Sequence, residues 1–122
     1  MEESVRHFAI GGLFFIGLSH VVRPVVWARF FGWIGSAGDV GSFVNGMLAI
    51  TWGLFIAVFH NVWTGLPVLL TVIGWLSVLK GAVYLLFPAF GTRIMTTAAT
   101  SGTKFRLAGA ALLVVAATLA FA

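Results

Sequence analysis

The sequence contains no cysteine and few charged residues. The absence of cysteine excludes disulfide bonds, thiolate metal sites and cysteine nucleophiles. Charged residues make up 8% of the 122 positions, whereas ordinary soluble domains carry about 25%. Seven basic and three acidic side chains cannot cover the surface of a soluble globule of this length. This shortage excludes a soluble enzyme, a disordered segment and a nucleic-acid-binding domain, so we expect no nucleic-acid partner.

The sequence also lacks the residue sets that catalysis requires. Glu2 and Glu3 are expected at one side of a membrane and Asp39 at the other, so they cannot form the close carboxylate pair of glycosidases or aspartic proteases. Ser19 and His20 are adjacent and have no third member of a catalytic triad. No glycine-rich phosphate-binding motif is present. We therefore predict that the protein is not an enzyme and holds no metal or cofactor.

Long apolar segments are what the sequence has in abundance. Hydrophobic residues make up 61% of the chain, and the mean hydropathy is +1.10. A membrane-spanning helix needs roughly 20 mostly apolar residues, and four segments meet this requirement. They cover about residues 5–22, 42–59, 66–87 and 105–122. We predict an all-α integral membrane protein in which four transmembrane helices form a single domain over residues 1–122.

The connections between these segments differ in character. Residues 25–34 read VVWARFFGWI, an apolar and aromatic stretch with one arginine, which predicts a helix lying in the headgroup plane. Residues 89–95 are a weaker version of the same pattern. Residues 96–104 are small and polar and are expected to be flexible. Pro67 is expected to begin a span, while Pro24 and Pro88 should end or kink the runs before them.

The basic residues predict the orientation in the membrane. The connections on one side carry most of them, namely Arg23, Arg29, Arg93, Lys104 and Arg106. Arg6 is the base on the other side. Because cytoplasmic loops are enriched in lysine and arginine, the two long connections should be cytoplasmic. We predict an integral membrane protein of the bacterial inner membrane with both termini outside, in the periplasm.

An internal repeat is indicated when the sequence is shifted by 64 residues. Gly17 then matches Gly81 and Pro24 matches Pro88, and one deletion also aligns Gly46 with Gly109. Each half consists of a span, a proline, an interfacial segment with arginine, and a second span. This order predicts two tandem helical hairpins related by a pseudo-two-fold axis along the membrane normal. The alternative is that small membrane hairpins resemble one another without duplication.

Two family resemblances follow from these motifs. A span ending in Leu-Leu-Phe-Pro88, a short interfacial stretch with Arg93 and a second span rich in glycine and alanine resemble the YjeT-type family of small two-span inner-membrane proteins of unknown function. The likeness covers residues 74–122 and more loosely 11–61, as in a duplicated member. The four-span layout, with Gly-Leu-Ser-His20 near the end of the first span, is similar to DoxX-like membrane proteins. Both resemblances imply a small four-helix membrane bundle and supply no catalytic residue.

Small residues recur at helical spacing within the spans. They should allow helices to approach closely in lipid, where packing at small side chains drives association. On the second span they are Ala49, Gly53 and Ala57, and on the third Gly74, Ser77 and Gly81. We predict that these six residues pack helices within the bundle, although a face toward another protein is an alternative.

Lys80 is the ionisable residue that lies deepest within a span. A charged side chain at that depth is costly and indicates a functional site, but its long stem could also carry the ammonium group to the headgroups. Asp39 is its natural partner for an ion pair. If the first three spans pack together, Lys80, His20, Asn45 and Tyr84 should form a small polar pocket near the same interface.

The histidines leave two further alternatives. His20 could instead bond a backbone carbonyl or a neighbouring helix, as a lone histidine in a helix usually does. His7 and His60 could meet each other at the opposite end of the spans and hold a metal or haem there.

Three functions are consistent with this sequence. The first is a small non-catalytic accessory or structural subunit of a larger respiratory, photosynthetic or oxidase complex. The alternative is a small oligomeric transporter or channel with a polar site near Lys80. A third possibility, a membrane redox or haem protein, rests on three histidines and five tryptophans. The expected partners are membrane lipids, together with other membrane subunits or further copies of the chain.

Overall fold

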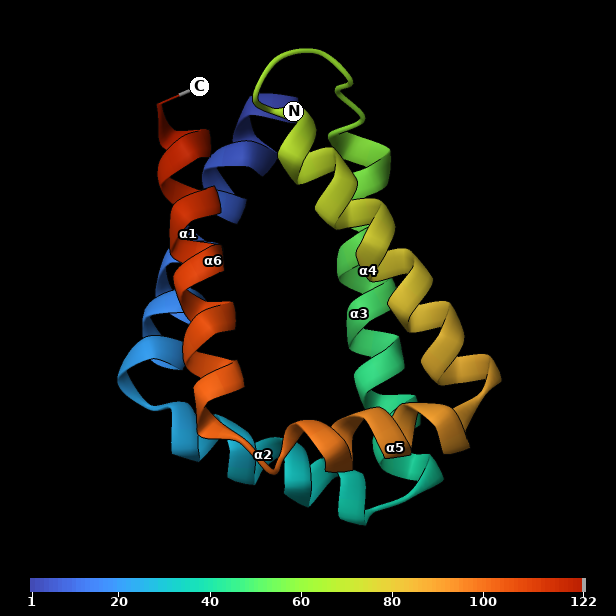
Figure 1. The fold of residues 1–122 in the computed structure, drawn as a ribbon. Helices are drawn as coiled ribbons and strands as arrows, with labels where there is room; N and C mark the ends of the chain where they lie inside the picture. The colour runs from blue at the N-terminus through green and yellow to red at the C-terminus, as the bar shows by residue number, and fades with distance from the viewer. Residues whose placement is uncertain (122) are drawn as a thin grey trace.

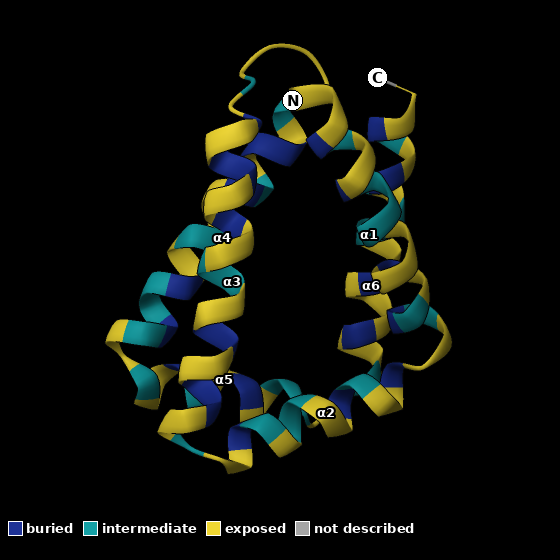
Figure 2. Ribbon diagram, turned by 180° about the vertical axis from the view of Figure 1, so that it is seen from behind, coloured by how far each residue is buried: buried dark blue, intermediate teal, exposed yellow. Residues whose placement is uncertain are grey.

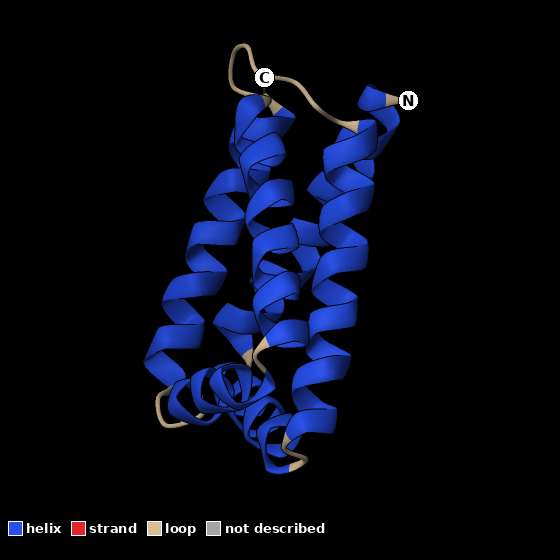
Figure 3. Cartoon of the chain, turned by 90° about the vertical axis from the view of Figure 1, so that its right-hand side faces the viewer, coloured by secondary structure: helices blue, strands red, loops and turns tan. Residues whose placement is uncertain are grey.

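Over residues 1–121, which the computed structural model describes, the chain is entirely helical outside its short connections (Figure 3). In chain order the helices are α1 (Glu2–Val22), α2 (Pro24–Ser36), α3 (Asp39–Phe59), α4 (Val68–Leu86), α5 (Pro88–Ala98) and α6 (Gly102–Ala120). Four of them, α1, α3, α4 and α6, are long and apolar enough to cross a membrane. The predicted all-α membrane protein with four spanning helices is therefore confirmed. The last predicted span extended to Ala122, which lies outside the described residues.

Two prolines set the boundaries between spanning and interfacial helices. Pro24 and Pro88 occupy the first turn of α2 and α5, where the missing N–H of proline leaves no hydrogen bond unmade. The preceding residues, Arg23 and Phe87, leave the helical region with φ of −128° and −129°. Helix α1 ends at Val22 and α4 ends at Leu86, one residue before the expected end of the third span, and each is followed at once by a helix.

The connection before α6 is more regular than the sequence indicated. The expected flexible stretch 96–104 is wrong for most of its length, because α5 continues to Ala98 and α6 begins at Gly102. Threonine hydroxyls satisfy helix carbonyls here: the Thr96 hydroxyl donates to the Thr92 carbonyl at 3.0 Å, and that of Thr100 donates to the Thr97 carbonyl at 2.8 Å. These local hydrogen bonds allow small polar residues to sit at a helix end.

The four spanning helices form two close pairs, α1 with α6 and α3 with α4 (Figure 1). The pairs approach each other at one end, which we call the terminal end because it carries the start of α1, the end of α6 and the loop 60–67 (Figure 1). They spread apart toward the opposite end, the base, where α2 and α5 run across beneath them and contact each other (Figure 1). Helices α1 and α3, which the tandem-hairpin prediction placed in one unit, make sparse contact.

Glycines bring the helices of each pair into backbone contact. A Cβ atom on Gly109 of α6 would lie 2.6 Å from the carbonyl oxygen of Gly17 of α1. On the other pair, a Cβ on Gly81 of α4 would lie 2.8 Å from the carbonyl oxygen of Gly46 of α3. Both distances are too short for a side chain, so the close approach requires glycine, as is common where helices associate in lipid.

A small apolar core joins the two pairs at the terminal end. It consists of Ala9, Ile56, Leu70 and Leu119, one residue from each spanning helix. Most other large apolar side chains are exposed along the spanning and interfacial helices (Figure 2). In a bilayer this surface meets lipid tails, which are as apolar as the side chains themselves. The pairs therefore touch near the terminal end and are spaced by α2 and α5 at the base.

Candidate functional site

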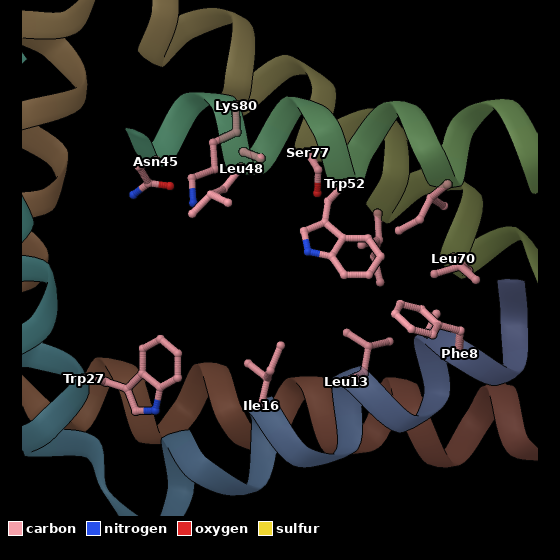
Figure 4. Close-up of a pocket in the computed structure, with 15 residues that line it drawn as sticks. Phe8, Leu13, Ile16, Trp27, Asn45, Leu48, Trp52, Leu70, Ser77 and Lys80 are labelled. Carbon is pink, nitrogen blue, oxygen red and sulfur yellow. The ribbon is translucent and has the colours of Figure 1, made fainter. Parts of the chain in front are cut away.

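A cavity of about 380 Å³ lies between α1 and the α3·α4 pair, which we call the inner cavity (Figure 4). Its walls come from α1, α2, α3 and α4 and are mainly aliphatic and aromatic. Such a volume lies within the range of about 300–1,000 Å³ that is usual for small-ligand pockets. The cavity exists because the close packing of the chain occurs within each helix pair, so the space between the pairs is left unfilled.

The polar groups of the inner cavity gather toward the base. Lys80 of α4 and Asn45 of α3 lie at that end, with the Trp27 ring of α2 opposite them (Figure 4). Ser77 of α4 lies one turn farther from the base. Phe8 and Leu70 lie at the far, apolar end of the same cavity (Figure 4). Among the described residues that line the cavity, Lys80 is the one charged side chain.

Lys80 also borders a second cavity of about 500 Å³, between α4, α5 and the start of α6. Tyr84 and Met95 line this second cavity. The Lys80 ammonium nitrogen lies 5.4 Å from the centroid of the Tyr84 ring, within the range of a cation–π contact. Lys80 therefore stands between two spaces: it lines the inner cavity with Asn45 and the second cavity with Tyr84, and the single pocket of His20, Asn45, Lys80 and Tyr84 stays a prediction. The predicted ion pair of Lys80 with Asp39 stays a prediction.

His20 lies one layer behind the inner cavity. Its Nδ1 atom is 2.7 Å from the Ile16 carbonyl, to which it can donate. Its ring stacks on Trp27 with centroids 3.9 Å apart, and the Trp27 indole N–H donates to the Ser19 hydroxyl at 2.8 Å. The alternative of a carbonyl-bonded histidine thus describes His20, which supports the cavity wall through Trp27.

Buried polar contacts also hold the base of α3 against its neighbours. The Asn45 amide lies 3.3 Å from the sulfur of Met95 in α5, and the fully buried Ser42 hydroxyl donates to the Tyr84 carbonyl at 2.9 Å. Sequence reasoning missed Ser42 and Met95, because their partners are distant in the chain. Periodic spacing could identify the buried face of α3 but not what lies on it.

The six predicted packing residues divide into two groups. Gly53, Gly74 and Gly81 lie at close backbone approaches between α3 and α4, and Ala57 is buried beside Gly74. Ala49 and Ser77 instead line the inner cavity. The small-residue spacing therefore marks both a helix contact and the adjoining cavity wall.

At the terminal end, His60 follows the last residue of α3, is fully buried and contacts Thr71 of α4. The Thr71 hydroxyl lies 2.9 Å from the His60 carbonyl, and the Arg6 Nε lies 3.5 Å from the His60 Nε2. Burial lowers the pKa of His60 below its ordinary value of 6.5. The close partners of His60 are thus Arg6 and Thr71, whereas His7 is exposed. Within residues 1–121, no group of three or more histidine, cysteine or acidic residues is placed to hold a metal.

The inner cavity is thus an apolar space with one cation at its base end. It can hold a small amphipathic molecule whose polar group faces Lys80. Comparisons with known proteins add nothing to this geometry: no protein-family model, no curated protein and no solved structure matches the chain. The resemblances to YjeT-type and DoxX-like proteins stay expectations from the sequence.

Proposed function

We propose that the protein is a small membrane transporter or carrier that binds its substrate at the polar end of the inner cavity, near Lys80. The observation that carries this proposal is an intramembrane cavity with a single lysine at one end. An ionisable side chain inside a membrane span is costly, and such residues mark substrate and ion pathways. The second cavity, which shares Lys80, offers a route on the other side of the same residue.

Single-cysteine accessibility tests this proposal, because the native chain has no cysteine to remove. In Ser77→Cys, the thiol would face the inner cavity. In Val114→Cys, it would face lipid on α6, where the native side chain is 65% exposed. In proteoliposomes, a carrier should let a membrane-impermeant thiol reagent reach Ser77→Cys from both sides and leave Val114→Cys unmodified. Modification of Ser77→Cys from one side or from neither would refute transport.

A non-catalytic accessory subunit is the second candidate. It is supported by the extent of apolar surface on all four spans, including Phe15 at 70% and Leu79 at 61% exposure, and by the short connections between them. Gentle detergent extraction from native membranes, followed by mass determination, tests this candidate. A fixed set of other subunits would support it, and a lone chain or a homo-oligomer would contradict it. A visible spectrum of the same sample tests the redox alternative, which requires an absorbing group.

We also propose that the base faces the cytoplasm of a bacterial cell and that both termini are periplasmic. The base carries Arg29 on α2 and Arg93 on α5, and Lys104 and Arg106 begin α6. This excess of basic residues is typical of cytoplasmic loops. A cysteine introduced in the loop 60–67 should react with an impermeant reagent in intact cells stripped of their outer membrane. A cysteine between α5 and α6 should not react, and the reverse pattern would invert the orientation.

We propose further that the two halves arose by duplication. The crossing of Gly17 with Gly109 corresponds, through the 64-residue shift with one deletion, to the crossing of Gly81 with Gly46. Arg23 and Phe87, 64 residues apart, also share similar backbone angles. If the crossings are equivalent, Gly17→Ala and Gly81→Ala should lower the free energy of unfolding by similar amounts. A large penalty at one and none at the other would count against equivalence.

A further inference from the structure

We propose that the inner cavity binds a single-chain amphiphile with a carboxylate head group, a long-chain fatty acid in its simplest form. The carboxylate lies at Lys80, and the acyl chain runs toward Phe8 and Leu70. This inference rests on the proposed function, because it requires the inner cavity to be a binding site. It adds the chemical class of the ligand, its orientation and its route of entry.

The base end of the cavity supplies what a carboxylate needs. The Lys80 ammonium group can form a charge-assisted hydrogen bond with a carboxylate, the strong class of such bonds. The Asn45 side chain lies at the same end, with its amide oxygen toward Lys80 (Figure 4) and its amide nitrogen 3.3 Å from the Met95 sulfur, so it adds polarity beside the lysine. The cavity lining contains no acidic side chain among the described residues. An anionic head group would therefore neutralise the lysine, whereas a cationic one would be repelled.

The remainder of the cavity supplies what one acyl chain needs. Leu13, Trp52 and Ile73 line the space between Lys80 and Leu70. At 1.5 Å per helical residue, Lys80 and Leu70 are separated by about 15 Å along α4. The apolar core at Ala9, Ile56 and Leu119 closes the terminal end. A volume of about 380 Å³ suits one chain rather than the two chains of a phospholipid.

The ligand can enter sideways from the bilayer. Helices α1 and α3 make sparse contact along the side where the cavity lies. Lys80 is about 9 Å along α4 from Leu86 at the base, at 1.5 Å per residue. The carboxylate of a fatty acid in the adjacent leaflet lies at the headgroup level, which is nearer to Lys80 than to the apolar end of the cavity. The head group would then meet Lys80 without crossing the apolar end of the cavity.

Tryptophan fluorescence of the purified full chain tests this inference, because Trp27 and Trp52 line the cavity at different depths (Figure 4). Palmitic acid brominated near its carboxyl end should quench Trp27 more strongly. Palmitic acid brominated near its methyl end should quench Trp52 more strongly. Variants that retain one of these two tryptophans, with phenylalanine at the other tryptophan positions, report each depth separately. Equal quenching by both acids, or quenching that does not saturate, would overturn the proposed orientation.

Matched variants test the role of the charge. Lys80→Met should weaken saturable quenching by at least about tenfold, because a charge-assisted hydrogen bond is lost. Lys80→Arg should keep most of the affinity, and Lys104→Met, outside the cavity, should match the native chain. If Lys80→Met proves unfolded by circular dichroism, palmitylamine replaces it as the test. This amine has the same chain and a cationic head, and tight binding of palmitylamine by the native chain would overturn the proposal.

A second variant pair tests the position of the acyl chain. A Cβ on Gly12 meets no atom within 4 Å, and Gly12 lines the cavity. The space beside Gly11 is equally open, but Gly11 is not part of the lining. Gly12→Leu should therefore obstruct the chain and weaken palmitate quenching, whereas Gly11→Leu should not. Equal affinities in the two variants would contradict the assigned path.

Two comparisons separate the ligand class from the proposed function. If Ser77→Cys reacts from both sides but palmitate does not bind saturably, the ligand class is wrong and the transport proposal stands. If palmitate binds as expected but Ser77→Cys reacts from one side or neither, transport is wrong and the binding site stands. Tighter binding of brominated lysophosphatidic acid than of palmitic acid would replace the carboxylate with a phosphate monoester.

Discussion

Replacing Gly81 with alanine should drive α3 and α4 apart. An added Cβ would lie 2.6 Å from the backbone nitrogen of Ile50 and 2.8 Å from the carbonyl oxygen of Gly46. Both atoms belong to the α3 backbone, so no side-chain rotation can relieve the overlap. The two helices must separate or shift along their whole contact.

The expected magnitude follows from comparison with a second alanine variant. Overpacking a well-packed interior costs about 1–3 kcal/mol. Alanine in a helix is also favoured over glycine, by about 1 kcal/mol in aqueous helices, which opposes this cost. Gly12→Ala has the same propensity gain and no neighbouring atom within 4 Å. The difference between Gly81→Ala and Gly12→Ala should therefore isolate the overlap, at about 1–3 kcal/mol.

The free energy of unfolding can be measured by titrating the detergent-solubilised protein with sodium dodecyl sulfate and following helix content by circular dichroism. Gly81→Ala should unfold at a lower mole fraction of dodecyl sulfate than Gly12→Ala. If the two curves coincide, the close approach of α3 and α4 at Gly81 is wrong, and the reasoning that places the cavity between two tight pairs fails with it.

Three further predictions concern the ends of the helices. Because burial lowers the pKa of His60, the unfolded chain binds more protons than the folded chain when the pH is below the ordinary value of 6.5. The contribution of His60 to the free energy of unfolding should therefore be complete above that pH and fall as the pH drops toward the lowered pKa. Thermal unfolding at several pH values checks this, and His60→Gln should abolish the pH dependence. Gly38→Ala should lower the free energy of unfolding by about 1–3 kcal/mol, because φ of 66° with ψ of −133° suits glycine. In the same dodecyl sulfate titration, Gly11→Ala, at an open position of α1, should not lower it. Ser42→Ala should lower the free energy of unfolding by about 0.5–1.5 kcal/mol, because a buried hydrogen bond to the Tyr84 carbonyl is lost. Ser36→Ala, which removes an exposed hydroxyl, should leave the free energy of unfolding nearly unchanged in that assay.

The spanning helices could be predicted from the sequence because their signal is local. Hydropathy over about 20 residues identifies a span regardless of its neighbours, and Pro24 and Pro88 fixed two of the boundaries. The second interfacial helix, α5, was underestimated because glycine and threonine lower its apolar character. Its stability comes from packing on α2 and α3, which a local pattern does not contain.

The pairing of the spans could not be predicted, because a face of small residues does not indicate which other helix packs against it. The spacing identified Gly53 and Gly81 as packing residues, but it could not distinguish an α3·α4 contact from an α1·α3 contact. The same limit applies to His60, for which sequence reasoning considered His7 as a partner. The structure places His60 against Thr71, which follows in the next helix across a loop and has no periodic relation to it.

The pairing of α1 with α6 has a consequence for biogenesis. Helices α3 and α4 are close in the chain and can associate soon after both enter the membrane. Helix α1, however, cannot pair with α6 until α5 and α6 have been synthesised. During this interval its Gly17 face meets lipid or a membrane insertase rather than Gly109. Chains interrupted before α6 would leave this face of α1 without its partner helix.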